Sequence, residues 1–176
     1  MTGDGSPASD RDEGPRSTTD DPTARVGERL HVLAAGAEQI VEVVARASRM
    51  RATEVHALVA IASAEGTGLP TTPGDLAQAL RLTTGAITGL VDRLVHSGHV
   101  HRLPDTADRR RVRLVCREPG RAVVGEVLGT LAGRARAVML ALTTEERCAV
   151  DRFLDEVGFA TAAYLHAHDV RRPGSD

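Results

Sequence analysis

A run of small side chains between residues 84 and 97 is the first feature of this sequence that could do chemistry. At about 100° per residue the apolar side chains of this segment gather on one side of a helix, which leaves Gly85, Ala86, Thr88 and Gly89 facing outward. We call these four residues the small face. Each glycine in a soluble helix costs about 1 kcal/mol relative to alanine, so two of them suggest that a partner must come close. A DNA major groove is such a partner, since a threonine hydroxyl and methyl can meet base edges there.

Arginine is concentrated directly after the small face. Residues 93–121 hold eight arginines and three acidic residues, a net charge of +5, whereas residues 1–25 hold three arginines and six acidic residues, a net charge of −3. An arginine at a loop tip can enter a narrow minor groove while its neighbours bind phosphate. A charge run in isolation is more often a solvated loop, but the adjacent small face favours a polyanionic partner.

Two short helices position the small face. Residues 72–75 place Thr72 as an N-cap, Pro73 in the first helical position and Asp75 three residues after the cap, which predicts a helix over 73–80. Only three residues separate it from a helix over 84–97, which ends before a glycine. Two short helices joined by so tight a turn form a helix-turn-helix.

A basic hairpin follows the helix-turn-helix. Apolar and polar residues alternate over 99–103 and 111–116, which predicts two strands joined by the polar loop 104–110. Asp108 is expected to orient a neighbouring arginine, because phosphate would repel a bare carboxylate. Helix, turn, helix and hairpin is the element order of a winged helix.

Long helices are predicted on both sides of the winged helix, over 26–48 and 119–142 and from Thr143 onward, with a further helix over 52–64. Aromatic residues make up only 2% of the chain, so its core must be aliphatic, which favours helices. The apolar stripes of the outer helices are too wide for the small winged helix to cover. The predicted fold class is mainly α with a small β-hairpin wing.

Several function classes are disfavoured. No window approaches the roughly 18 apolar residues of a membrane span, and the polar start lacks the apolar run of a signal peptide, so a soluble cytoplasmic protein with no membrane partner is expected. The sequence has no phosphate-binding glycine motif and no arrangement typical of a catalytic triad. We therefore expect no catalytic residue, no cofactor and no enzymatic activity.

The cysteines and histidines give weaker signals. Cys116 and Cys148 are too few and too far apart for a metal or disulfide framework, and small, buried or half-buried hydrophobic positions are expected for both. His96, His99 and His101 could suggest metal sensing, but a phosphate contact or a pH-dependent charge fits them as well. No metal site is expected.

Three stretches together resemble the multiple-antibiotic-resistance regulator (MarR) family of bacterial transcription factors. They are PGDLAQAL at 73–80, GAITGLVDRL at 85–94 and GHVHRLPDTADRRR at 98–111. The resemblance covers about residues 30–165, and its most specific part is the Asp-Arg-Arg sequence at 108–110. It implies a homodimer built by the terminal helices, with two winged helices on a pseudo-palindromic operator in double-stranded DNA. It also implies that a small molecule or an oxidant relieves repression.

The resemblance also assigns residues. Thr84, Ala86 and Thr88 fall where family members contact bases, and Arg109 or Arg110 where the wing enters the minor groove. Arg51 stands where the family commonly has a helix-capping threonine. Gly89 stands where many members carry a long polar residue, which shifts the burden to shape and phosphate contacts. With Asp108 as a structural wing residue, the residues expected at the DNA are Thr83, Thr84, Gly85, Ala86, Thr88, Gly89, Arg93, Arg102, Arg109, Arg110 and Arg111.

The leading hypothesis is thus a dimeric MarR-type repressor with the small face in the major groove and the arginine wing in the minor groove, released by a small-molecule effector. The alternative is a winged-helix protein-interaction module that has lost specific DNA binding. The expected organisation is a disordered acidic tail, a first dimerisation helix, a winged helix-turn-helix, C-terminal dimerisation helices and a disordered end, over residues 1–25, 26–50, 51–118, 119–168 and 169–176.

Overall fold

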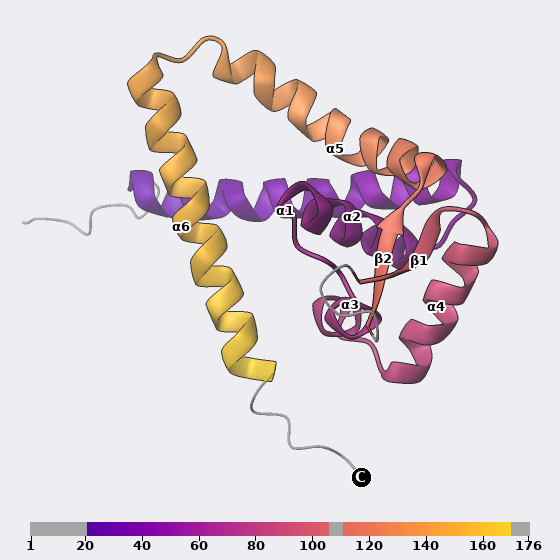
Figure 1. The fold of residues 1–176 in the computed structure, drawn as a ribbon. Coiled ribbons are helices and arrows are strands. Elements are labelled where there is room, and N and C mark those ends of the chain that lie inside the picture. Colours follow the sequence, from indigo (N-terminus) through magenta and orange to yellow (C-terminus); the bar gives the residue numbers. More distant parts are fainter. Residues whose placement is uncertain (1–20, 106–110, 170–176) are drawn as a thin grey trace, which may run out of the picture.

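The computed structural model describes residues 21–105 and 111–169, and this part of the chain is helical apart from one hairpin and the connecting turns (Figure 1). The predicted fold class is confirmed. In chain order the elements are α1 (Pro22–Ala47), α2 (Ala52–Gly66), α3 (Pro73–Leu80), α4 (Thr84–His96), β1 (Val100–Pro104), β2 (Val112–Cys116), α5 (Glu118–Met139) and α6 (Thr144–Asp169).

The helix-turn-helix forms, and its first helix is capped as predicted at Thr72. The Thr72 hydroxyl accepts a hydrogen bond from the Asp75 N–H at 3.2 Å, and the Asp75 carboxylate accepts one from the Thr72 N–H at 2.8 Å. At the start of α4 the Thr83 hydroxyl accepts from the Ala86 N–H at 3.3 Å. Between the two helices Arg81 takes the left-handed conformation, with φ at 53°, which turns the chain from α3 into α4.

The winged helix has an aliphatic core to which α2, α3, α4 and the hairpin all contribute. Its largest side chains are less than 2% exposed, which fixes α4 against the other helices through its apolar side. These side chains are Leu58, Ile61, Leu76, Leu90, Leu94 and Leu114.

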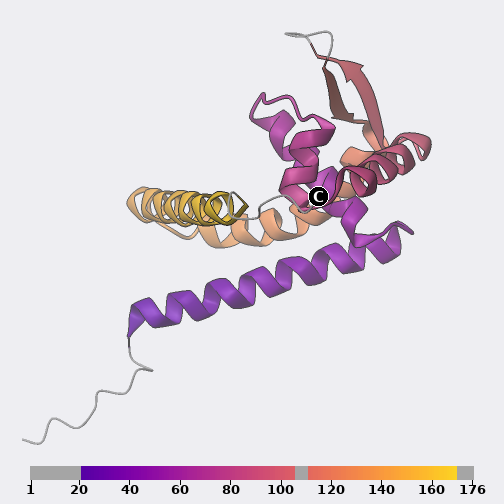
Figure 2. The same ribbon diagram turned by 90° about the horizontal axis from the view of Figure 1, so that it is seen from below.

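The hairpin is antiparallel, with Val100 opposite Cys116 and Pro104 opposite Val112. Each strand begins one residue later than predicted, and β1 extends to Pro104. The physical reason at β1 is that the His99 N–H donates to the Leu94 carbonyl at 2.9 Å and so closes the end of α4. Figure 2 shows the hairpin projecting from the winged helix on the side away from α1.

The outer helices also differ from the prediction at their ends. The first was expected to begin at Val26, but α1 begins at Pro22, because Asp21 caps it by accepting from the Thr23 N–H at 2.9 Å and proline occupies its first turn. Residues 22–25 are therefore helical, although they lack the apolar periodicity on which the prediction rested. The predicted tail over 1–20 lies outside the described residues.

Three further helix ends shift. Helix α2 continues to Gly66 instead of ending at Ala64, and α5 ends at Met139, three residues early. The Leu140 N–H still bonds to the Arg136 carbonyl, but the following residues make shorter-range turns that lead into α6. Helix α6 extends to Asp169, the residue at which the disordered end was predicted to begin.

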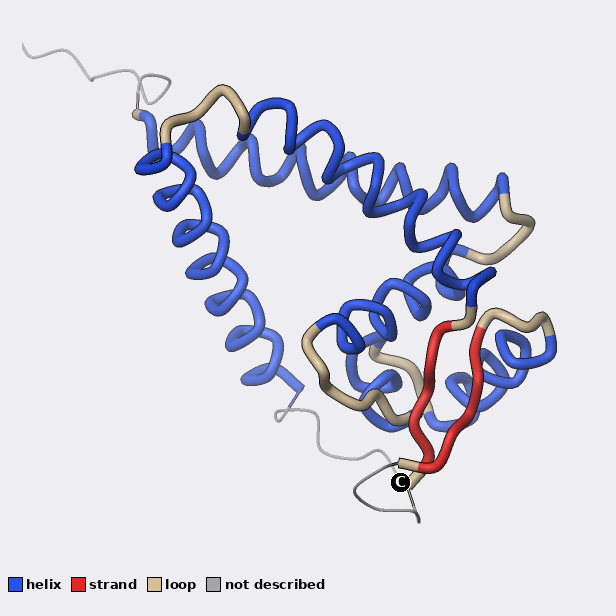
Figure 3. Tube along the Cα trace, turned by 45° about the horizontal axis from the view of Figure 1, so that its top comes forward, coloured by secondary structure: helices blue, strands red, loops and turns tan. Residues whose placement is uncertain are grey.

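Helix α5 leaves the winged helix beside α1, and α6 turns back at an angle, so that it stands apart from the other elements (Figures 1 and 3). The apolar side chains of α6 are consequently exposed, as the width of their stripe predicts. Within the described residues no helix is both long and apolar enough to cross a bilayer. The exposed large side chains of α6 are Phe153, Leu154, Phe159, Tyr164 and Leu165.

Candidate nucleic-acid interface

Three members of the small face lie on an open surface at the start of α4. Gly85, Ala86 and Thr88 are exposed, as is Thr84 beside them. A Cβ atom added at Gly85 would meet nothing within 4 Å, so the backbone is accessible there to a close partner. The opposite side of α4 is buried in the core. The structure therefore brings these predicted site residues together on one face.

The hydroxyl groups of Thr83 and Thr88 already make hydrogen bonds within α4. The Thr88 hydroxyl donates to the Thr84 carbonyl at 2.8 Å, and the Thr83 hydroxyl acts as the N-cap. Thr88 keeps its methyl group and its acceptor lone pairs for a partner, whereas Thr83 serves first to start the helix.

Gly89 departs from the prediction, because it is half-buried. The nearest atom to a Cβ added there is an Nη of Arg93, at 3.7 Å. Side chains on a helix lean toward its N-terminus, so the residue four positions later covers this spot. The open part of the small face is thus confined to the first turn and a half of α4.

Two arginines expected at the DNA are paired with carboxylates. Arg93 Nε lies 2.8 Å from Glu54 Oε1, and an Arg102 Nη lies 2.7 Å from Asp92 Oδ1. The first pair joins α4 to α2, and the second joins α4 to β1. Both arginines are partly exposed, so a phosphate can still approach them, but it competes with a carboxylate already in place.

Glu54 is the more buried partner, with its side chain 12% exposed. Burial opposes charge on this carboxyl, but the hydrogen bonds from Arg93 and from the Arg51 backbone N–H outweigh it and lower the pKa of Glu54. The Arg51 N–H donates to Glu54 at 3.0 Å, so Glu54 supplies half of a capping box although Arg51 has no side-chain acceptor. Helix α2 therefore begins at Ala52, as predicted, although Arg51 stands where the resemblance to the MarR family implies a capping threonine.

The wing residues that the structure describes frame the loop. Arg111 is exposed, and its carbonyl accepts from the Asp105 N–H at 2.9 Å, which closes the base of the loop. The predicted arginines of the tip and their orienting aspartate lie outside the described residues; they are Arg109, Arg110 and Asp108.

The cysteines and histidines that the structure describes do not gather into a metal-binding cluster. Cys116 is buried as expected, and burial with the nearby Glu65 charge raises the pKa of its thiol to about 11, which keeps it protonated. The prediction is wrong for Cys148, which is exposed. His99 Nδ1 lies 2.8 Å from the Ser97 hydroxyl, and the part of the chain that is described holds no cluster of three or more metal-ligand side chains.

A second cluster, of charged side chains, lies on the other side of the hairpin and was not predicted from the sequence. Arg113, Glu65 and Arg121 meet there from three different elements. The only signal in the sequence was the alternation of Arg113 with buried Leu114, which places the arginine on the face of β2 opposite the core.

A helix-turn-helix with an exposed small face, followed by a basic hairpin, defines a winged helix-turn-helix protein. The family model described as MarR family matches residues 48–111, which contain this unit. A curated relative, the uncharacterized HTH-type transcriptional regulator YcgE of Bacillus subtilis, is 50% identical over 46 residues, which cover 26% of this chain and 30% of that protein. The matched part thus spans less than a third of the relative.

Solved structures resemble a larger part of the chain. A mutant MepR from a multidrug-resistant S. aureus clinical isolate aligns with a TM-score of 0.61 at 17% identity, over 81% of this chain and 99% of that one. A MarR family protein from Bacillus stearothermophilus aligns with a TM-score of 0.58 at 22% identity, over 80% and 95%. At such identities these likenesses show the fold. The match to the MarR family model covers residues 48–111, which hold the winged helix-turn-helix, and the solved structures extend the likeness in fold over most of the chain.

Proposed function

We propose that this protein is a MarR-family regulator that binds a pseudo-palindromic operator as a homodimer and represses transcription. The observation that carries the proposal is the open start of α4, where Gly85 leaves the backbone accessible beside exposed Ala86 and Thr88. A major groove about 12 Å wide admits a helix, and small side chains let it approach the base edges closely. The exposed Arg111 and the tip arginines Arg109 and Arg110 would bind the adjacent backbone and minor groove.

The homodimer is supported by apolar surface that one subunit leaves uncovered. On α6 the side chains of Phe153 and Leu154 are 40% and 52% exposed, and Val32 and Leu33 of α1 are exposed as well. Exposed apolar patches beyond a few hundred Å² mark interaction sites. A second copy of this chain would cover these helices and hold two winged helices at a fixed separation, as a pseudo-palindromic operator requires.

Effector release is the third part of the proposal. A cavity of about 380 Å³ lies between α1 and α5, with Ile40, Val43 and Val44 on one side and Glu126 and Thr130 on the other. MepR of S. aureus, which shares the fold at a TM-score of 0.53 and 16% identity over 77% of this chain and 95% of its own, has been solved bound to ethidium bromide. A small molecule held between the dimerisation helices could change the spacing of the two winged helices.

The experiment that tests DNA binding replaces Gly85 with leucine. The larger side chain enters open space in the free protein, so folding should be retained, whereas the groove approach is blocked. Fluorescence anisotropy on a duplex selected from a random-sequence pool should show at least a tenfold loss of affinity. Gly66→Leu is the matched control, because a side chain at Gly66 also meets nothing within 4 Å, and it should bind as the wild type does.

The second candidate is a protein-interaction module, and the pairing of Arg93 and Arg102 with carboxylates favours it, because these pairs reduce the charge free to meet phosphate. Selection from the pool discriminates the two. A regulator enriches a consensus and binds it at least a thousandfold more tightly than random DNA. An interaction module enriches none.

A further inference from the structure

The hairpin continues into α5 through a single residue. Strand β2 ends at Cys116 and α5 begins at Glu118, so only Arg117 lies between them. The Arg117 carbonyl accepts from the Arg121 N–H at 2.8 Å, which is the first hydrogen bond of the helix. The direction in which α5 leaves the winged helix is therefore set within residues 116–121, which we call the α5 joint.

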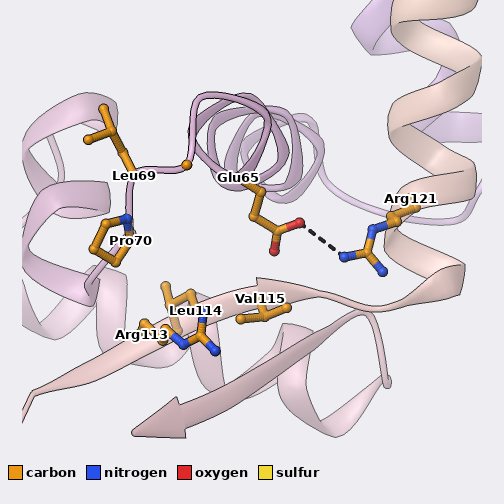
Figure 4. Close-up of a pocket in the computed structure, with 8 residues that line it drawn as sticks. Glu65, Leu69, Pro70, Arg113, Leu114, Val115 and Arg121 are labelled. Carbon is orange, nitrogen blue, oxygen red and sulfur yellow. Dashed lines mark hydrogen bonds and ion pairs between the residues drawn. The ribbon is translucent and has the colours of Figure 1, made fainter. Parts of the chain in front are cut away.

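Glu65, near the end of α2, bonds to both sides of the α5 joint. One of its carboxylate oxygens accepts from the Cys116 N–H at 2.7 Å, and the other lies 3.1 Å from an Nη of Arg121 in the first turn of α5. Figure 4 shows Glu65 reaching from α2 toward the strand, with a dashed line to Arg121. A single side chain thus connects α2 with the last residue of β2 and with α5.

The bond to Cys116 stands where a neighbouring strand would otherwise donate an acceptor. On the outer edge of β2 the Leu114 N–H donates to the Thr71 carbonyl at 2.7 Å, and two residues later the Cys116 N–H donates to Glu65. Cys116 is buried, and buried N–H groups in native proteins nearly always have a partner. The carboxylate therefore satisfies a buried donor of the hairpin, which fixes its place at the joint.

The contacts at the joint differ in kind from those further along α5. Val123 and Val127 are buried in the core, and hydrophobic burial has no preferred direction. A charge-assisted hydrogen bond does have one. At Gly120 the first turn of α5 packs closely, because a Cβ added there would lie 2.5 Å from the His99 carbonyl oxygen. Close packing at Gly120 together with the Glu65 contacts leaves the angle of α5 little freedom.

We propose that Glu65 is a positioning residue that sets the angle between the winged helix and α5, and thereby the separation of the two DNA half-sites that the homodimer accepts. Helix α5 leads to α6, whose exposed apolar side chains form the proposed contact with the second copy. Because a helix of 22 residues is about 33 Å long, a tilt of about 5° moves its far end by about 3 Å, nearly the rise of one base pair. The inference rests on the proposed homodimer and its operator.

The DNA test varies the spacing between the half-sites. The duplexes carry the selected operator, the same operator with one base pair inserted or removed at its centre, or a single half-site. Fluorescence anisotropy measures their affinity for the wild type and the variants. The wild type should prefer the selected spacing by at least tenfold. In Glu65→Ala this preference should fall at least fivefold, whereas the affinity for the single half-site should stay within twofold of the wild type.

Two further variants separate positioning from folding. Glu65→Gln keeps an oxygen for the Cys116 N–H but loses the charge opposite Arg121, so its spacing preference should lie between those of the wild type and Glu65→Ala. Glu118→Ala is the control and should keep the wild-type preference, because Glu118 carries the same charge in the same joint but is exposed and lies outside the Glu65 cluster. An equal loss of affinity at every spacing and at the single half-site would show a merely structural role and overturn the proposal.

A second readout observes the joint without DNA. Nitroxide labels at Arg111→Cys and Arg134→Cys, both at exposed positions, report the distance between the hairpin and α5 by pulsed electron paramagnetic resonance. A Cys148→Ser background removes the exposed native thiol, and dilution with unlabelled chain restricts the signal to distances within one subunit. The distance distribution should broaden in both Glu65 variants and not in Glu118→Ala.

An unchanged distribution in both Glu65 variants, or equal broadening in Glu118→Ala, would overturn the proposal. If the distribution broadens but the wild type selects no DNA sequence, Glu65 still sets the angle of α5 and the proposed function fails.

Discussion

At the scale of single residues, Gly85 and Gly120 show what two helical glycines do in different surroundings. A Cβ at Gly85 would meet open space, whereas one at Gly120 would lie 2.5 Å from the His99 carbonyl oxygen and 3.2 Å from Leu58. The absence of a side chain at Gly120 lets α5 pack against the end of α4. At Gly85 no neighbour within 4 Å requires the side chain to be absent.

Alanine substitution should therefore change stability in opposite directions at the two glycines. Gly85→Ala should raise the free energy of unfolding by about 0.5–1 kcal/mol, the difference in helix propensity. Gly120→Ala should lower it by about 1–3 kcal/mol, because the backbone must shift. Urea denaturation measures both. A destabilised Gly85→Ala would show that Gly85 is needed by the fold and not by a partner.

Glu54 gives a pH-dependent prediction. Its pKa is lowered in the folded chain, so the unfolded chain binds more protons, and the stabilisation by Glu54 is full above its ordinary pKa of 4.5 and is lost as pH falls through the folded value. At pH 7 Glu54→Gln should reduce the free energy of unfolding by about 1–2 kcal/mol.

The difference between wild type and Glu54→Gln should shrink on titration below pH 4.5. Glu145→Gln is the control, because Glu145 is exposed in the first turn of α6, which is not part of the winged helix. A gap between wild type and Glu54→Gln that stays constant from neutral to acidic pH would contradict the role given to the Arg93 pair.

At the scale of elements, local chemistry made the helix-turn-helix predictable from sequence. The caps at Thr72 and Thr83 and the capping box at Thr143 and Glu146 act within four residues, so sequence alone places α3, α4 and the start of α6. The pairings of Arg93 with Glu54 and of Arg121 with Glu65 join residues that are 39 and 56 positions apart. Periodicity carries no information on such contacts. The sequence therefore predicted on which face of a helix or strand a side chain lies, but not which distant residue it contacts.

The wing element gives a prediction about salt. Replacing both Arg109 and Arg110 with alanine removes two cations from the loop tip and should weaken operator binding. Because each phosphate contact adds about 0.9 to the slope of log affinity against log salt, the slope should fall by about 2. Anisotropy titrations at several salt concentrations measure it. An unchanged affinity and slope would show that the wing does not contact DNA.

At the scale of the whole molecule, α6 stands apart from the rest of the subunit and leaves large apolar side chains exposed. Leu154 lies on the predicted apolar stripe and is 52% exposed, so Leu154→Glu should leave the fold intact and shift the protein from dimer to monomer at micromolar concentration. Arg152→Glu is the control, since Arg152 is exposed on the side of α6 away from the stripe.

Sedimentation velocity distinguishes the species of these variants, and circular dichroism checks that both remain folded. A wild-type protein that sediments as a monomer, or a Leu154→Glu variant that remains a dimer, would remove α6 from the interface. The paired spacing of the two winged helices would then lose its structural basis.

Dimethyl sulfate footprinting on the selected duplex tests whether α4 enters the major groove, because this reagent reports the accessibility of guanine N7 there. If two α4 helices lie in the major groove, two major-groove segments about 10 base pairs apart, or a multiple of that spacing, should be protected, and both should be lost in Gly85→Leu at concentrations that saturate the wild type. Protection that persists in Gly85→Leu, or bound DNA whose major-groove guanines react as freely as in naked duplex, would contradict it.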